Sequence, residues 1–207
     1  MILKLSQTEK ELYSARFEIC RESAQAGTVS LQGTMGSRNA VIGGNFYRTR
    51  FEMEFGENHY MAGSGFRPYR LVQDGVEVGV VCQTMFSGGF FNKFEYYMMM
   101  KNGQAYDMYP VGLGKEGNKY PVYCGDVQIA MAEKDCVVYD DLHQYRILAQ
   151  DADAALVTLL FCMHLYVNES YKPGVKTTEG KMKYVSLTTN KTLKRKYDSA
   201  FKDRIGR

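Results

Sequence analysis

The sequence predicts a mainly β protein, a closed antiparallel β-barrel of about twelve strands around a central hydrophobic C-terminal helix, followed by a basic C-terminal extension. Three observations predict it. Apolar and polar residues alternate in short segments up to about residue 150, as they do in half-buried strands. Turn dipeptides separate these segments at short intervals. One late run, residues 152–167, is apolar all round and breaks the alternation.

The strand prediction rests on a period of two. In FYRTRFEMEF, residues 46–55, every odd-numbered position is apolar or Thr. Every even-numbered position from 48 to 54 is Arg or Glu. The segment ELYSARFEIC, residues 11–20, repeats this pattern and predicts an inward face of Tyr13, Ala15, Phe17 and Ile19. Each segment therefore predicts a strand with one face in the core.

The hairpin prediction rests on turn residues between apolar runs. Asp74-Gly75, Asn102-Gly103 and Gly125-Asp126 each separate two such runs. Asp-Gly and Asn-Gly are strong signals for tight β-hairpins, because both residues tolerate the positive φ that these turns require. No alternation of strands with helices is present, so we expect an antiparallel sheet.

The apolar run ADAALVTLLFCMHLYV predicts a buried helix that begins at an Asp151 or Asp153 N-cap. Sixteen helical residues rise about 24 Å, which is less than the roughly 30 Å of a hydrocarbon core. We therefore favour a core helix over a membrane span. A barrel of about twelve strands encloses a space that must be filled, and a helix is about 10 to 12 Å across.

Two stretches carry a resemblance to a known family. They are PYRLVQDGVEVGVV (68–81) and GDVQIAMAEKDCVVYDDLHQYRILAQDADAALVTLLFCMHLYV (125–167). In the second, a strand, a Lys-Asp turn, Asp-Asp, a Tyr-containing strand, an acidic cap and an apolar helix follow one another. Over about residues 45–167 this order resembles the tubby C-terminal-like superfamily, which includes tubby proteins, phospholipid scramblases, LURP-one-related proteins and many small bacterial proteins.

The resemblance implies a twelve-stranded barrel around a central helix. It implies no single function, since members bind phosphoinositides (tubby), have lipid-related roles (scramblases) or have no assigned role. The basic phosphoinositide-binding residues of tubby do not align with this chain, so none is transferred. The cysteine-rich and calcium-binding segments of scramblases are not seen in the sequence.

The sequence contains no pattern that predicts catalysis, a metal or a cofactor. The G-x-G-x-x-G match at residues 112–117 is followed by Asn-Lys-Tyr-Pro, which favours a loop over a dinucleotide site. His59, His143 and His164 lack metal-ligand spacing. We expect His143 in a surface turn beside Asp140-Asp141, and His164 as a neutral core imidazole bonded to a strand carbonyl.

The charge divides the chain near Lys172-Pro173-Gly174. Residues 1–170 carry 15 Lys/Arg against 20 Asp/Glu, whereas residues 171–207 carry 11 against 3. We therefore predict a barrel domain over 1–170 and a basic extension over 171–207. Within the extension, residues 192–206 predict an amphipathic helix with Leu193, Tyr197, Phe201 and Ile205 on one side.

The leading functional hypothesis is a non-enzymatic binding or scaffold module for an anionic lipid headgroup or a protein partner. Basic amphipathic helices bind anionic membrane surfaces, and the candidate residues are Lys194, Arg195 and Lys196. The tail helix could instead pack on its own barrel. Two alternatives are an enzyme with a site at a barrel rim and a structural protein that homo-oligomerises through its tail. Nucleic acid is disfavoured because the body is acidic.

The cellular location is also an expectation. MILKLSQTEKEL has charges from residue 4 and no apolar core of a signal peptide. Five Cys without C-x-x-C spacing favour a reducing compartment. We expect a cytoplasmic protein, peripheral to membrane where it binds lipid.

Overall fold

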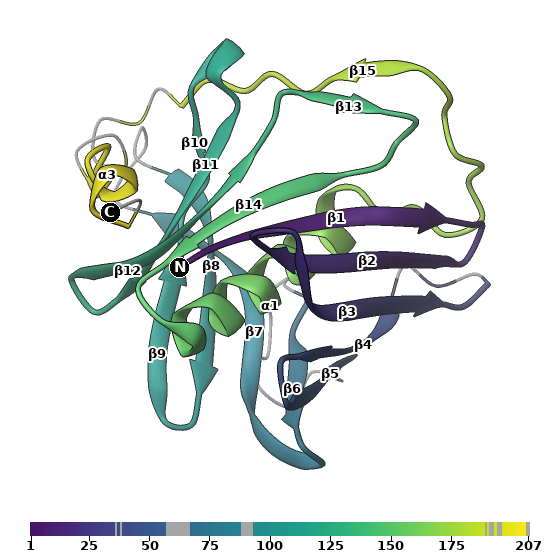
Figure 1. Ribbon diagram of the computed structural model, residues 1–207, viewed down its shortest axis with the longest axis horizontal. Coiled ribbons are helices and arrows are strands. Elements are labelled where there is room, and N and C mark those ends of the chain that lie inside the picture. Colours follow the sequence, from purple (N-terminus) through teal and green to yellow (C-terminus); the bar gives the residue numbers. More distant parts are fainter. Residues whose placement is uncertain are drawn as a thin grey trace.

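The computed structural model (Figure 1) describes the chain except for Gly36, Arg38, 57–66, 88–92, Thr189, Lys191, Thr192, Lys194, Arg195 and 206–207. His59, one of the three histidines considered above, lies outside the described residues. The elements in chain order are β1 (Ile2–Lys10), β2 (Ser14–Arg21), β3 (Ala24–Gly33), β4 (Ala40–Phe46), β5 (Thr49–Phe55), β6 (Tyr69–Gln73), β7 (Val76–Ser87), β8 (Lys93–Lys101), β9 (Gln104–Met108), β10 (Val111–Gly112), a 3₁₀ turn (Gly114–Glu116), β11 (Asn118–Cys124), β12 (Val127–Lys134), β13 (Val137–Tyr139), β14 (Gln144–Ala149), α1 (Ala152–Glu169), β15 (Lys181–Lys183) and α3 (Phe201–Ile205).

Twelve antiparallel strands close into a barrel. The hydrogen-bonded order is β11-β12-β14-β1-β2-β3-β4-β5-β6-β7-β8-β9, and β9 pairs again with β11 to complete the ring. The closing contact is short, with only the pairs Val122↔Met108 and Tyr123↔Asp107. β10 is an additional strand beside β11. The predicted fold class is confirmed.

The period of two places the core as predicted. In β2, Ala15, Phe17 and Ile19 are buried while the residues between them are exposed; Tyr13, predicted on the same face, precedes the strand and is half-buried. The expected strand over 46–55 is wrong at its start. Phe46 ends β4, and Tyr47 and Arg48 form a turn in which Tyr47 has φ of 53°. The alternation of apolar and polar residues continues through this turn, so the alternation alone does not reveal it.

The three hairpins form where the turn residues predict them. Asp74-Gly75 joins β6 to β7, and Asn102-Gly103 joins β8 to β9. All four of these residues have positive φ, between 50° and 82°, as a type I′ turn demands. Gly125, with φ of 59°, opens the turn between β11 and β12.

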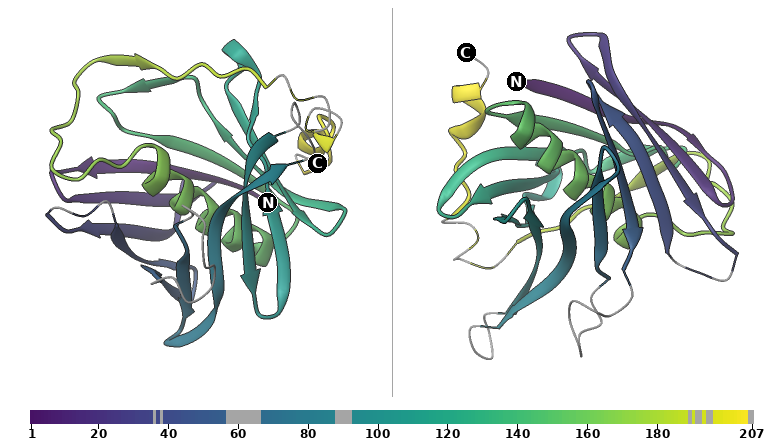
Figure 2. Two further views of the ribbon diagram at one scale, coloured as in Figure 1. Left: turned by 180° about the vertical axis from the view of Figure 1, so that it is seen from behind. Right: turned by 90° about the horizontal axis from the view of Figure 1, so that it is seen from below.

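The helix α1 is buried on every side. Asp151 is its N-cap, and the carboxylate accepts a hydrogen bond from the Ala154 N–H at 2.8 Å. Every residue from Ala154 to Val167 is buried. One core cluster joins α1 to inward side chains of all twelve ring strands. The views in Figures 1 and 2 show the helix lying among the strands, so it fills the barrel.

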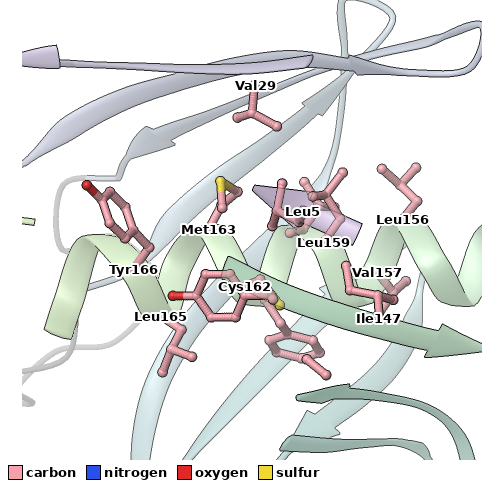
Figure 3. Packing of buried hydrophobic residues seen from close by; sticks show 14 of the residues in the cluster. Leu5, Val29, Ile147, Leu156, Val157, Leu159, Cys162, Met163, Leu165 and Tyr166 are labelled. Carbon is pink, nitrogen blue, oxygen red and sulfur yellow. The ribbon is translucent and has the colours of Figure 1, made fainter. Parts of the chain in front are cut away.

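Packing along the helix is dense (Figure 3). Leu5, Val29 and Ile147 come from three different strands. They belong to one buried cluster with Leu159 and Met163 of the helix, and all five residues are 0% exposed. Near its C-terminal end, the Tyr166 ring meets Phe17 edge-on with centroids 4.9 Å apart. Gln7 of β1 donates to the Tyr166 hydroxyl at 3.0 Å.

No helix among the described residues combines the length and the apolarity that crossing a membrane requires. The apolar character of α1 is instead matched by its burial within the barrel.

A truncation in α1 tests its role as the filling of the barrel. We expect Leu159→Ala to lower the free energy of unfolding by about 2 to 5 kcal/mol, because Leu159 is fully buried and its removal leaves a cavity. Urea denaturation followed by circular dichroism measures this. Met35→Ala, at an 83% exposed turn residue, should change stability by less than about 0.5 kcal/mol. Equal effects of the two variants would contradict a filled barrel.

Candidate functional site

The basic extension packs on the outer wall of the barrel. Phe201 of α3 is only 1% exposed and contacts Met131 of β12 and Leu148 of β14. Tyr197 and Ile205 pack against the same cluster. The apolar stripe predicted for the extension therefore covers an apolar patch of its own barrel.

The extension does not form one continuous helix over 192–206. Leu193 and Lys196 are helical, Tyr197 and Asp198 are not, and α3 begins at Phe201. Asp198 accounts for the break, because its carboxylate accepts from the Ala200 N–H at 2.9 Å. An Asp side chain that accepts a hydrogen bond from the backbone N–H two residues later forms a turn, and this turn competes with continuation of the helix.

The structure describes one of the three candidate residues of the extension. Lys194 and Arg195 lie outside the described residues. Lys196 is described, and its ammonium lies over the rings of Tyr109 and Tyr123, at 4.7 Å and 4.6 Å from their centroids. The Tyr123 hydroxyl also donates to the Lys196 carbonyl oxygen. Lys196 thus contacts the outer face of the barrel.

A groove lies on the outer wall beside α3. It has a volume of about 740 Å³ and is formed by β1, β2, β11, β12, β14 and Lys202 of α3. Its charged lining residues are Lys4, Lys119, Arg146, Lys202, Glu22, Glu133 and Asp135. Four cations against three carboxylates give it a small positive excess.

Strand register aligns the groove's side chains in one row. Lys4 of β1 is paired with Cys20 of β2 on one side and with Arg146 of β14 on the other. Arg146 is paired with Glu133, which is paired with Lys119. These residues alternate with the inward positions Leu3, Leu5, Tyr145 and Ile147, so they point outward.

Ion pairs join three of the charged side chains of the groove, whereas two of its lysines form none. Glu133 bonds Lys119 at 2.9 Å and Arg146 at 3.4 Å. Burial alone would raise the pKa of Glu133, but the charges of Lys119, Lys202 and Arg146 outweigh it and lower the pKa. Lys4 and Lys202 are exposed and form no ion pair with any residue that the structure describes.

This arrangement suits an anion with several oxygens. Lys4 and Lys202 approach the groove from different elements, β1 and α3. Arg146, the neighbour of Lys4 in the row, presents a planar guanidinium that is 42% exposed. Guanidinium and ammonium groups bind phosphate oxygens through charge-assisted hydrogen bonds.

A second polar cluster lies inside one end of the barrel. The ammonium of Lys10 pairs with the carboxylate of Asp141, whose other oxygen lies 3.2 Å from His143 Nε2. The His143 ring stands 5.5 Å from the Tyr166 ring, and Gln7 accepts from the His143 N–H at 3.0 Å. The cluster fastens the start of β14 to β1 and to the core helix.

The expectation of a surface turn at His143 is wrong. The residue is fully buried, because Asp140 and Asp141 both adopt positive φ, 52° and 57°, and turn the chain inward before β14. Burial and the charge of Lys134 lower the pKa of His143 to about 4, against the opposing effect of Asp141. Lys134 is itself buried, which lowers its pKa.

Chemically, this cluster is an unpromising active site in this structure. The side chains of Lys10 and His143 are 3% and 0% exposed, so no substrate can reach them. Local sequence offered only one signal for the cluster, the Asp-Asp pair before His143.

His164 follows the sequence expectation. Its Nε2 lies 2.9 Å from the Arg67 carbonyl oxygen, and Nδ1 lies 3.1 Å from Asn168 Nδ2. The carbonyl belongs to the residue two before β6. Burial lowers the pKa of His164 to about 4, so the ring is neutral at pH 7, with Nε2–H donating to Arg67.

The structure places no group of three or more His, Cys, Asp or Glu side chains where they could hold a metal ion, as far as the described residues go. The five cysteines are free thiols.

Comparisons with protein-family models, with curated proteins and with solved structures give no match. The resemblance to the tubby superfamily therefore stays a prediction. The site must be interpreted from its own geometry.

The buried histidine predicts how stability depends on pH. Between the ordinary pKa of 6.5 and the folded value of about 4, the unfolded chain binds a proton that folded His164 does not. The free energy of unfolding should therefore fall as the pH drops through this window, by at most about 1.4 kcal/mol per pH unit from this residue.

His164→Gln keeps an amide donor for the Arg67 carbonyl and removes the titration. Urea denaturation at several pH values between 7 and 4.5 should show a shallower loss of stability for this variant than for the natural protein. Parallel pH profiles for the two proteins would contradict a neutral, buried His164.

Proposed function

We propose that this protein is a non-enzymatic barrel module that binds the phosphate-bearing headgroup of an anionic lipid at the outer groove. Lys4, Arg146 and Lys202 are the proposed contacts, with the extension completing the groove through α3. The proposed lipid site thus contains residues of both the extension and the barrel, whereas the sequence suggested the extension alone. It makes the protein peripheral to membrane.

The observation that carries the proposal is the unpaired lysines of the groove. Lys4 and Lys202 are exposed and both line a cavity of about 740 Å³, and neither lies within ion-pair distance of a carboxylate of the described residues, although the charge of Lys202 reaches Glu133. A cation held without a partner beside a cavity attracts an anion by its local field. Each cation near an anionic membrane surface contributes about 1 kcal/mol to binding.

A helix beside the groove supplies contact with the membrane surface. Lys202 and Arg204 both lie on α3 and are exposed, and Arg204 is paired with the carboxylate of Asp198. Phe201 from the same helix is buried against Met131 and Leu148. This fixes the cations of α3 relative to Arg146 in the sheet.

The alternatives have less support. An enzyme with a site at the barrel rim could use the Asp141–His143 pair and Lys134. All three side chains are buried, so a substrate has no access to them. Homo-oligomerisation through the tail stripe would need Phe201, which its own barrel buries. A protein partner at the groove would use the same cations.

Vesicle co-sedimentation with neutralised lysines tests the groove. We expect Lys4→Gln with Lys202→Gln to weaken binding to phosphatidylserine-containing vesicles about 30-fold, since two cations at about 1 kcal/mol each are lost. Raising the salt concentration should weaken binding of the natural protein by screening. Point variants are preferable to removal of the tail, which would expose Met131 and Leu148.

The matched control is Lys176→Gln with Lys183→Gln. It changes the net charge equally, and both lysines are exposed outside the groove. Equal losses in the two double variants would show that net charge alone drives binding. No binding of the natural protein to anionic vesicles at low salt would refute the lipid proposal.

A further inference from the structure

Three tyrosines form an aromatic corner on the outer face of the barrel at its closing seam. Tyr96 lies on β8, Tyr109 follows β9 and Tyr123 lies on β11. Their neighbours Tyr97, Met108 and Val122 point into the core, so the three rings point outward. The Tyr96 and Tyr109 rings stack at 5.4 Å with planes 16° apart, while Tyr109 meets Tyr123 at 6.0 Å and 73°.

A cation already occupies this corner. The Lys196 ammonium lies 4.7 Å from the centroid of Tyr109 and 4.6 Å from that of Tyr123. Two ring faces at a steep angle therefore contact one positive charge, within the roughly 6 Å over which cation–π attraction acts.

A carboxylate completes the surroundings of the cation. Asp107 is paired with Tyr123 across the seam and is half-buried. Burial raises the pKa of Asp107, and the charge of Lys196 acts in the opposite direction. Asp107 thus lies close enough to interact with the charge that the rings hold.

The corner offers the Lys196 ammonium fewer hydrogen-bond acceptors than it has N–H donors. An ammonium carries three N–H donors, yet of the described residues only the Tyr109 hydroxyl lies within hydrogen-bond distance of Nζ, at 3.5 Å. A quaternary ammonium has no N–H to satisfy and is less strongly hydrated. Aromatic faces with one nearby carboxylate and few acceptors favour such a group over a primary ammonium.

We propose that Tyr109, Tyr123 and Asp107, with Tyr96 stacked behind Tyr109, form a binding site for a quaternary ammonium group of the choline type. Lys196 is the built-in occupant of this site and competes with the ligand. The Lys196 backbone is held by the Tyr123 hydroxyl, so only its flexible side chain has to turn away. The site is separate from the outer groove and does not depend on lipid binding there.

Titration with choline chloride, followed by two-dimensional NMR, tests the site. We expect Lys196→Ser to bind choline about tenfold more tightly than the natural protein, because the competing side chain is gone. Lys176→Ser is the matched control: it removes an exposed lysine of the same extension that lies outside both this corner and the groove, and it should bind like the natural protein. Adding Asp107→Asn or Tyr109→Leu to Lys196→Ser should abolish the gain.

The ligand's charge is tested with 3,3-dimethylbutanol, the uncharged analogue of choline, which should not bind. Vesicles of phosphatidylcholine distinguish a lipid headgroup from a free cation as the ligand. If Lys196→Ser sediments with these vesicles, the ligand is a lipid headgroup. If it binds choline but does not sediment, the ligand is a free cation. Equal affinity of Lys196→Ser and the natural protein for choline, with both folded, would overturn the proposal. Equal binding of the uncharged analogue would do so too.

The natural protein provides a second measurement that needs no variant. The Hε protons of Lys196 lie over ring faces and should resonate at shielded positions. Saturating choline should move them toward the values of an exposed lysine. Shielded Lys196 signals that stay unchanged while choline binds elsewhere would also overturn the proposal.

Discussion

Burial of α1 on every side from Ala154 to Val167 is the constraint on which the rest of the structure depends. A helix that is apolar on every side leaves no face for water, so strands must surround it. The ring achieves this with twelve strands, and its closing contact between β9 and β11 consists of two residue pairs. Side chains from all twelve strands share one core with the helix. Because the core cluster fills the lumen, the groove beside α3 lies on the outer wall.

The polar groups at the end of the helix are consistent with that burial. Glu169, in the last turn of α1, is exposed, and its carboxylate accepts a hydrogen bond from the hydroxyl of the buried Tyr97 at 3.0 Å. Lys134 and His143 are buried nearby, and the pKa of each is lowered. Buried ionisable groups shift toward their neutral forms when few partners are present. The rim therefore closes the core, and its chemistry differs from that of an open active site.

The extension links the two candidate sites on the outer wall. Its Lys196 enters the tyrosine corner at the β9–β11 seam, and its α3 supplies Lys202 to the groove beside β1 and β14. Between these points, Phe201 covers apolar residues of β12 and β14. A segment that reads in the sequence as a basic tail is thus a structural part of the barrel surface. Its charges act together with residues from strands far away in the chain.

The sequence by itself determined most of the strands, three hairpins, an acidic cap at Asp151 or Asp153 and the core helix, because these depend on contacts between near neighbours and on the alternation of apolar side chains. It could not place Tyr47 in a turn or bury His143. Only the tertiary structure decided the sites. Lys4, Arg146 and Lys202 become neighbours through strand register and docking of α3, and Lys196 meets Tyr109 only because the barrel closes beside the tail. Such contacts join residues that are distant in the chain, and local patterns carry no information about them.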